Sequence, residues 1–215
     1  MVLSWDTMTK PKISVVIPAY NEALSIGKVV TECQQFCDEI IVVDDGSTDE
    51  TAETAKNSGA VVVCHGTNLG VTKATKSGFE ATYGDIIVTI DADGQHNPSD
   101  IPRLVKPIIE AKADLTLGVR EMIPHRSERI INSMASLRVK CSDSGTGFRA
   151  LKADLAKKMR LHGACLCGTF VLEAHKHGAR ITEIPIKVRL RVKEKRKMRT
   201  RHVKQFFYVL RDLIF

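Results

Sequence analysis

The sequence predicts an α/β fold in which a mostly parallel β-sheet is covered by helices on both faces. Short apolar runs that are typical of strands alternate with segments whose apolar residues recur at helical spacing. The apolar runs are unbroken, as expected for strands that are buried on both sides. The chain has 215 residues, which is enough for one domain with a substantial core.

The first 120 residues contain five predicted strands separated by four predicted helices. The strands are expected at residues 13–17, 39–43, 60–64, 85–90 and 115–119. Asn21 is expected to cap the first helix, and Ser47 with Glu50 forms a capping-box pattern before the second, which should stop at Gly59. The third helix is expected over about residues 69–83, and Asn97-Pro98 should open the fourth.

The second half of the chain is less regular. Helices are expected over residues 125–139, 152–160 and 166–177, with a loop at 142–149 and an extended segment at 179–192. The last segment, 202–215, is predicted to be an amphipathic helix. Its apolar face comprises Val203, Phe206, Phe207, Leu210, Leu213 and Ile214. This face either docks on the domain or contacts a membrane interface, and both interpretations stay open.

Composition and charge exclude several classes of protein. No apolar run reaches the ~18–20 residues that a membrane-spanning helix needs, and the first residues lack a signal-peptide core. Six cysteines without a CxxC pair favour a reduced, cytoplasmic location. The net charge is +7, but residues 187–204 alone hold ten basic side chains and one acid. The basicity therefore belongs to one stretch near the C-terminus.

Two other binding functions are not expected. The basic stretch lacks a recognisable nucleic-acid motif, and its neighbouring aromatic residues do not interleave with the charge. The histidines and cysteines of residues 162–177 are possible zinc ligands, but their spacing fits no familiar zinc motif. These residues are His162, Cys165, Cys167, His175 and His177.

Polar residues gather after three of the predicted strands. Pro18-Ala-Tyr-Asn-Glu22 follows the first, Asp44-Asp-Gly-Ser47 the second and Asp91-Ala-Asp-Gly-Gln95 the fourth. In open parallel sheets, ligands bind beyond the carboxyl ends of the strands. No GxGxxG motif follows the first strand, which argues against an ordinary dinucleotide site.

Asp91 and Asp93 are the clearest candidates for metal ligands in the sequence. Their i, i+2 spacing at the end of a strand lets both carboxylates point the same way. Hard oxygen donors of this kind suit Mg²⁺ or Mn²⁺, and such an ion would neutralise charge growing on a diphosphate leaving group. Acidic residues are also common in loops after strands, so a structural role stays open for this pair.

Three of these segments together resemble the family 2 glycosyltransferases: Val16-Ile-Pro-Ala-Tyr-Asn-Glu22, Ile41-Val-Val-Asp-Asp-Gly-Ser-Thr-Asp49 and Ile90-Asp-Ala-Asp-Gly-Gln-His96. Within the family, the chain is most similar to the branch that transfers mannose or glucose to polyprenyl (dolichyl) phosphates. Asp143-Ser-Gly-Thr-Gly-Phe-Arg149 and Glu183-Ile-Pro-Ile186 are similar to motifs of that branch. The resemblance extends over nearly the whole chain.

The resemblance implies the GT-A fold, which is Rossmann-like, as one domain over residues 1–215. Its core would run from about residue 12 to 197, with a basic, amphipathic C-terminal helix at 198–215. It also implies a nucleotide-sugar donor and Mg²⁺ or Mn²⁺ as cofactor. The implied nucleotide-binding residues are Pro18, Ala19, Tyr20, Glu22, Asp45, Asp91, Ala92 and Asp93, and the implied metal group is Asp91, Asp93 and Gln95.

For individual donor residues, other roles stay open. A carboxylate that accepts N–H bonds from the base is a sensible role for Asp45. Tyr20 could instead be a packing residue, and Asp44 could cap its loop.

On the acceptor side, Arg129 and Ser133 lie four residues apart on a predicted helix, hence on one face. They match in position an Arg/Ser pair that holds the lipid phosphate in the branch, although Arg126 is a rival for that role. Arg120 is expected to meet the donor diphosphate or the acceptor phosphate. The catalytic residues implied are Asp91, Asp93, Arg120 and Arg129.

Two further segments bear on the acceptor. Arg191 and Lys197 match the branch's R-x-x-G-x-S-K motif and are expected to bind the acceptor phosphate, but Glu194 and Arg196 replace its glycine and serine. For Asp143 and Arg149, an internal ion pair and a catalytic role both stay open.

The function that the resemblance implies is inverting, metal-dependent transfer of a sugar from GDP-mannose or a UDP-sugar to a polyprenyl or dolichyl phosphate. The enzyme would resemble a dolichyl-phosphate mannosyltransferase, serve protein glycosylation and lie peripherally on the cytoplasmic face of a membrane. An anionic lipid phosphate needs no strong general base, so positioning and electrostatics would carry the reaction. The alternatives are a family 2 enzyme with a soluble saccharide acceptor and a basic module that binds nucleic acid or anionic membranes beside a degenerate sugar-nucleotide site.

Overall fold

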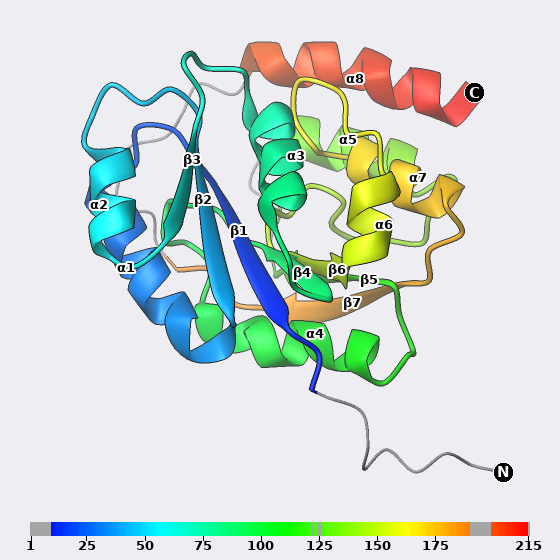
Figure 1. Ribbon diagram of the computed structural model, residues 1–215. Helices are drawn as coiled ribbons and strands as arrows, with labels where there is room; N and C mark the ends of the chain where they lie inside the picture. The colour runs from blue at the N-terminus through cyan, green and yellow to red at the C-terminus, as the bar shows by residue number, and fades with distance from the viewer. Residues whose placement is uncertain (1–9, 122, 124–125, 190–198, 215) are drawn as a thin grey trace, which may run out of the picture.

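A seven-stranded sheet forms the centre of the molecule, in the order β3-β2-β1-β4-β6-β5-β7 (Figure 1). This computed structural model describes residues 10–121, 123, 126–189 and 199–214. The strands are β1 Ile13–Ala19, β2 Glu39–Asp44, β3 Val61–Cys64, β4 Ile86–Thr89, β5 Leu115–Arg120, β6 Arg149–Lys152 and β7 Ile181–Ile186. All neighbouring strands pair in parallel except β6, which is antiparallel to both β4 and β5.

Helices cover both faces of the sheet, which confirms the predicted fold class. The helices are α1 Ala23–Cys33, α2 Thr51–Asn57, α3 Val71–Ala81, α4 Ile101–Ile109, α5 Arg126–Ala135, α6 Ala153–Lys158, α7 Thr169–Lys176 and α8 Arg199–Ile214, with 3-10 turns η2 Gln34–Phe36 and η3 Pro98–Asp100. Successive residues of β1 point to opposite faces, so Val15 belongs to the apolar cluster that includes α1, α2 and α4, and Val16 to the cluster that includes α3 and α5 to α7. The result is a three-layer α/β/α arrangement.

The strand β6 was not predicted. Residues 142–149 were expected to be a loop and 152–160 a helix, but Arg149–Lys152 form a buried strand between β4 and β5. The segment is only four residues long, and it begins and ends with a basic residue. Its strand structure therefore depends on pairing with distant partners rather than on a local pattern.

Two predicted helix starts were wrong in detail. Asn21 lies before the cap position of α1, with φ of 55°, and α2 begins at Thr51 with Glu50 at its cap. The side chains of Asn21 and Ser47 instead join the loops after β1 and β2. Asn21 N–H donates to Ser47 Oγ (2.8 Å), and Thr48 N–H donates to Asn21 Oδ1 (2.8 Å). The predicted opening of the fourth helix at Asn97-Pro98 is confirmed, since Asn97 caps η3 immediately before α4.

The C-terminal helix α8 lies across the top of the view in Figure 1 and docks through its polar face. The residues of this helix that are buried against the domain are His202, Gln205, Val209 and Asp212. The apolar face predicted from the sequence points outward instead, with Val203 61% exposed and Phe207 and Ile214 each 64% exposed. The helix is therefore docked, but its apolar face stays largely uncovered, with Leu213 at its edge packed against the core.

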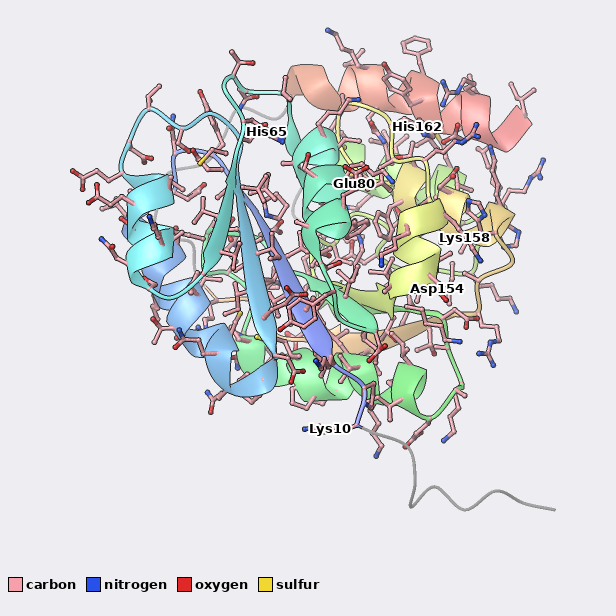
Figure 2. The ribbon with its side chains drawn as sticks, viewed as in Figure 1. Lys10, His65, Glu80, Asp154, Lys158 and His162 are labelled. Atoms are coloured by element: carbon pink, nitrogen blue, oxygen red, sulfur yellow. The ribbon has the colours of Figure 1, made fainter. Side chains whose placement is uncertain are left out.

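Hydrogen bonds to the segment before α7 explain this orientation. Gln205 is fully buried, its Oε1 accepts from Cys165 N–H (3.1 Å), and its Nε2 donates to Cys167 O (2.7 Å). Gly163 makes room for this amide, because its φ is +101° and a Cβ there would lie 2.6 Å from Gln205 Oε1. At the other end of the helix, His162 Nε2 lies 2.7 Å from Asp212 Oδ2, and Figure 2 shows His162 directly below α8.

We predict that Gln205→Leu lowers the free energy of unfolding by about 2–6 kcal/mol. The substitution leaves two buried backbone groups without their partner, at ~1–3 kcal/mol each. Urea denaturation followed by circular dichroism measures the change. Gln35→Leu is the matched control, because Gln35 is exposed and the same substitution there should change stability by no more than about 0.5 kcal/mol. Equal stability of the two variants would contradict this account of α8 docking.

Candidate active site

The loops that follow β1, β2 and β4 meet at one edge of the sheet. Ala19 at the end of β1 pairs with Asp44 at the end of β2, and Ile90 N–H after β4 donates to Val16 O of β1 (3.1 Å). Parallel strands place their carboxyl ends together. The predicted donor-site segments are therefore brought together by the fold.

Asp45 is the most firmly held carboxylate of the β2 loop. It is buried, its Oδ1 lies 2.8 Å from His65 Nδ1, and its oxygens accept from the N–H groups of Leu69 (2.9 Å) and Gly70 (2.7 Å). His65 in turn lies 3.0 Å from Ser77 Oγ of α3 through its Nε2. Figure 2 shows His65 at the start of the loop between β3 and α3. Asp45 thus organises the 65–70 loop, and its predicted contact with a nucleotide base stays a prediction.

The neighbouring residues of the predicted nucleotide site line the same edge. Pro18 and Tyr20 are partly exposed, whereas Ala19, Glu22 and Ala92 are buried. Glu22 N–H donates to Thr51 Oγ1 (2.8 Å), which fixes the β1 loop to the first turn of α2. Asp44 Oδ1 accepts from Ser47 N–H (3.3 Å), so Asp44 caps its own loop.

Asp91 lies directly after β4 and is ionised by its surroundings. Burial disfavours its charge, but the hydrogen bond with His96 and the charges of His96, Arg149 and Arg120 outweigh burial, so the pKa of Asp91 is lowered. His96 Nε2 lies 3.2 Å from Asp91 Oδ2, and His96 itself is buried against Phe148. The Asp91 side chain remains 46% exposed. It therefore offers an oriented carboxylate to a ligand.

The loop that precedes β6 passes very close to this carboxylate. A Cβ on Gly147 would overlap both carboxylate oxygens of Asp91, so a side chain at position 147 would displace this carboxylate. The loop is held by Thr89, whose Oγ1 donates to Gly147 O (2.8 Å). The glycine of the Asp143–Arg149 motif thus allows the acceptor-side loop to touch the carboxylate of the donor-side loop.

The donor set at this edge fits the divalent ion that the resemblance implies. Asp91 and Asp93 leave β4 two residues apart, and Gly94 with φ of +75° turns the chain so that Gln95 follows beside them. Asp93 Oδ1 accepts from Gln95 N–H (3.1 Å). Carboxylate and amide oxygens are the ligands that Mg²⁺ and Mn²⁺ prefer.

Arg120 lies at the end of β5, as predicted, and its guanidinium is held by two acids. Its Nε lies 2.7 Å from Asp143 Oδ2, and its Nη2 lies 3.0 Å from Glu128 Oε2. Burial opposes the charged forms of both Arg120 and Asp143, but their mutual hydrogen bonds outweigh it, so the pKa of Arg120 is raised and that of Asp143 is lowered. Asp143 therefore pairs with Arg120 rather than with Arg149.

Arg149 is instead buried behind the site. It is 2% exposed, and its guanidinium carbon lies 4.2 Å from the ring centroid of Phe170. Burial lowers the pKa of Arg149, and the nearby sulfur of Cys167 and the carboxylates of Asp91 and Asp143 favour its charge. From this interior position the charge of Arg149 favours the ionised form of Asp91, and its guanidinium is kept away from an incoming acceptor.

On the acceptor side, Arg129 and Ser133 share one exposed face of α5. They line an open groove of about 440 Å³ together with Ile130, Met134 and Leu137. Arg126, the rival residue, is exposed at the start of the same helix. Arg191 and Lys197 lie outside the described residues, so their predicted contact with the acceptor phosphate stays a prediction.

Several residues that shape the site were not singled out from the sequence: His65, His96, Glu128 and Gly147. His96 closes the motif that begins at Ile90, so its position five residues after Asp91 was a usable signal. His65 and Glu128 reach Asp45 and Arg120 from 20 and 8 residues away, respectively. Such pairs become visible only when the chain is folded.

Among the residues that the structure describes, no helix has both the length and the apolar character needed to cross a bilayer.

Known proteins with similar sequences include lipid-linked sugar transferases. The chain is 31% identical over 217 residues to the UDP-N-acetylglucosamine–dolichyl-phosphate N-acetylglucosaminyltransferase of Methanococcus voltae, covering 84% of this chain and 86% of that protein. It is 33% identical to the undecaprenyl-phosphate 4-deoxy-4-formamido-L-arabinose transferase of Edwardsiella ictaluri, covering 85% of this chain and 61% of that protein. It is also 32% identical to the uncharacterized protein MJ1222 of Methanocaldococcus jannaschii, covering 85% and 83% of the two chains.

Solved structures share the fold. The glucosyl-3-phosphoglycerate synthase of Mycobacterium tuberculosis, crystallised with Mn²⁺, UDP-glucose and phosphoglyceric acid, superposes with a TM-score of 0.79 at 26% identity. The match covers 94% of this chain and 79% of that one. It supports the GT-A fold that the motifs implied.

The family model described as glycosyl transferase family 2 matches residues 14–172. This range contains β1 to β6 and every described loop of the donor site. The chain therefore belongs to glycosyl transferase family 2.

Proposed function

We propose that this protein transfers a sugar from a nucleotide sugar to a polyprenyl phosphate at a membrane surface, with inversion at the sugar C1. The observation that carries the proposal is the juxtaposition of an Arg–Ser groove on α5 with the outward apolar face of α8. The two helices pack against each other, and α8 crosses above α5 in Figure 1. A cation and a hydroxyl for a phosphate are thus carried by the helix that packs against α8, whose exposed face suits a lipid.

The donor side supports a nucleotide sugar with a divalent ion. Asp91, Asp93 and Gln95 would hold Mg²⁺ or Mn²⁺, and the structural relative was crystallised with Mn²⁺ and UDP-glucose. When bound, the ion would stabilise the negative charge of the departing nucleoside diphosphate. The charges of His96 and Arg149 favour the ionised form of Asp91, and the hydrogen bond with His96 orients it. The relative whose name specifies UDP-N-acetylglucosamine favours a UDP-sugar over GDP-mannose.

The acceptor side supports a lipid phosphate. Arg129 and Ser133 offer a cation and a hydroxyl on one helix face, and the rest of the groove is formed by Ile130, Met134 and Leu137. A phosphate with an apolar tail matches this division of polar and apolar groups. Two relatives are named as transferases to dolichyl phosphate and undecaprenyl phosphate.

The membrane contact rests on the exposed apolar residues of both helices. On α8 these are Val203, Phe206, Phe207, Leu210 and Ile214, and on α5 and just after it they are Ile130 and Leu137. Lys204 and Arg211 are exposed on α8 between its apolar and buried faces. A helix with apolar residues on one face and cations at its border binds the interface of anionic membranes.

The reaction needs little acid–base chemistry from the protein. A phosphate monoester oxygen is already anionic at neutral pH, so it can attack C1 once it is positioned. The residues Arg129 and Ser133 would position it, while Asp91 and Asp93 face the leaving diphosphate on the other side. Two anionic substrates held in line favour a single displacement without a covalent enzyme intermediate.

A soluble acceptor is the second candidate, because the structural relative was crystallised with phosphoglyceric acid. Both acceptors present a phosphate or carboxylate to an arginine, and they differ in whether an apolar tail follows. The exposed face of α8 favours the lipid.

We predict that Asp91→Asn reduces metal-dependent sugar transfer at least ~100-fold, the scale seen when a group that stabilises the transition state is removed. Product is measured by mass spectrometry with Mn²⁺, a panel of nucleotide sugars and a short polyprenyl phosphate. Asp154→Asn is the matched control, because Asp154 is exposed on α6 (Figure 2) and its variant should keep full activity. Full activity of Asp91→Asn would refute the metal assignment.

We predict that Arg129→Gln raises the KM for polyprenyl phosphate about 10-fold or more, because a charge-assisted hydrogen bond contributes roughly 1.5–3 kcal/mol. The KM for the nucleotide sugar should not change. Arg126→Gln is measured beside it and distinguishes the two arginines. A rise in KM for Arg126→Gln alone would transfer the acceptor role to Arg126, and equal activity with phosphoglyceric acid would favour the soluble acceptor.

We predict that Phe207→Ser combined with Leu210→Ser weakens binding to vesicles of anionic phospholipid while nucleotide binding is retained. These side chains point outward, so their replacement leaves the buried face of α8 intact. Vesicle co-sedimentation measures binding, and Leu24→Ser on α1, at another exposed apolar residue, is the control. If the double variant and the control sediment equally, α8 does not contact the membrane.

A further inference from the structure

Two cysteines and one histidine form a compact, buried group beneath the start of α8. Cys165 and Cys167 lie in the segment before α7, and His202 lies in the first turns of α8. The two sulfur atoms and one ring nitrogen of His202 all lie within 4.8 Å of one another, and all three residues are buried. In the part of the chain that the structure describes, this is the one group of three or more His, Cys, Asp or Glu donors that meets such a distance limit.

We propose that Cys165, Cys167 and His202 form a binding site for a thiophilic divalent ion, Zn²⁺, that is separate from the carboxylate site at Asp91 and Asp93. Thiolate and imidazole are the donors that Zn²⁺ prefers. The sequence did not predict this site, because His202 lies 35 residues after Cys167. Two of the histidines near these cysteines in the sequence are used elsewhere: His162 bonds Asp212, and His177 bonds Glu173.

The distances suit one bound ion after a small closing movement. Zn–S bonds of about 2.3 Å and Zn–N bonds of about 2.0–2.1 Å place tetrahedral donors roughly 3.5–3.8 Å apart. The three donors lie within 4.8 Å of one another, so they need to approach by roughly 1.3 Å at most. Cys165 and Cys167 are in a loop, so this movement does not require a helix to shift. Three protein donors leave a fourth coordination position for water or a further ligand.

The histidine ring is already oriented by a neighbour. His202 Nδ1 lies 2.6 Å from Ser127 Oγ of α5. If Nδ1–H donates to this hydroxyl, the lone pair for a metal lies on Nε2. Histidines that bind metals almost always donate their other ring N–H to an oxygen acceptor, which fixes the tautomer and the ring plane.

The electrostatic surroundings favour the thiolate of Cys165 and the protonated thiol of Cys167. The hydrogen bond between the two cysteines lowers the pKa of Cys165 and raises that of Cys167, so the pair shares one proton. Arg149 favours the ionised form of Cys165, while Glu128 opposes it and would favour a cation in its place. In contrast, burial raises the pKa of Cys37 to about 12, and Cys37 is not part of any such donor group among the described residues.

A bound ion would join three parts of the molecule. It would connect α8 to the 162–169 segment at the point where Gln205 already bonds Cys165 and Cys167. It would also lie next to the loop of the Asp143–Arg149 motif, since a Cβ on Gly145 would be 3.7 Å from Cys167 Sγ. The site would thus stabilise the docked position of α8. This inference does not depend on the identity of the acceptor.

Cobalt spectroscopy tests the proposal, because Co²⁺ reports thiolate ligands directly. Reduced full-length protein, freed of metal with a chelator, is titrated with Co²⁺ in the presence of Mg²⁺. We expect one equivalent to produce thiolate-to-cobalt charge-transfer bands and the intense visible bands of tetrahedral cobalt, both removed by one equivalent of Zn²⁺. Zn²⁺ should also raise the melting temperature. Carboxylate-bound Co²⁺ gives no thiolate bands, so the two metal sites are distinguished.

Three variants locate the site. Cys167→Ser should abolish the charge-transfer bands or weaken Co²⁺ binding well beyond 10-fold, and Ser127→Ala should weaken it ~10-fold or more, as loss of an outer hydrogen bond to a ligand does. Cys64→Ser is the matched control, because Cys64 is exposed and its variant should bind like the wild type. Circular dichroism verifies that each variant is folded. If Cys167→Ser does not fold, the cobalt spectrum of the wild type alone shows whether thiolates bind the metal.

Three results would overturn the proposal: a wild-type cobalt spectrum without thiolate bands, bands of equal strength in Cys167→Ser, and a Cys165–Cys167 disulfide in the protein purified without reductant.

Discussion

The contact between Gly147 and Asp91 is the constraint on which the site depends. It exists because β6 enters the sheet antiparallel between β4 and β5, with Arg149 opposite Thr89. An antiparallel strand runs toward the opposite edge from its neighbours, so the loop before β6 arrives at the edge where β4 ends. The Asp143–Gly147 segment thereby reaches the carboxylate of Asp91, which it contacts at Gly147. A side chain at position 147 would force the Asp91 carboxylate out of its present position.

The same strand determines the charges behind the site. Arg149 begins β6 and is buried, so its charge must be compensated inside the protein. Asp91, Asp143 and Cys167 surround it and favour its ionised form. Asp143 forms its ion pair with Arg120, which is also bound to Glu128 of α5. One network of charges therefore runs from the carboxylate after β4 to the helix that carries the acceptor groove.

Much of the fold could be predicted from the sequence, because its strands and helices are defined by local patterns. The five β-strands of the first half and the helices between them follow from apolar runs, and the motifs placed Asp45, Asp91 and Asp93 at the correct edge. The strand β6 and the orientation of α8 could not be predicted in this way. Arg149–Lys152 become a strand only through β4 and β5, and no local pattern marks them.

The orientation of α8 shows the physical reason most clearly. Its apolar periodicity leaves two options for the face that carries Phe207 and Ile214: docking on the domain, which the burial of apolar surface favours, or contact with a membrane interface. Instead, Gln205 and Asp212 are buried, because the segment before α7 presents backbone groups and His162 that need polar partners. The location of those partners is a property of the folded domain. The helical pattern identifies an apolar and a polar face of α8, but it does not tell which of the two is buried against the domain.

The disposition of the arginines then limits which of them can reach an acceptor phosphate. Arg120 is bound by Asp143 and Glu128, and Arg149 is buried beside Phe170, so both charges are compensated inside the protein. Arg189 follows β7 and is bound to Glu32 (2.6 Å). Arg129 differs from these three, because its side chain is exposed and lines the open groove next to Ser133. Since a phosphate is held by a cation whose charge is not already neutralised, the geometry favours α5 over the sheet edge as the place where the acceptor is bound.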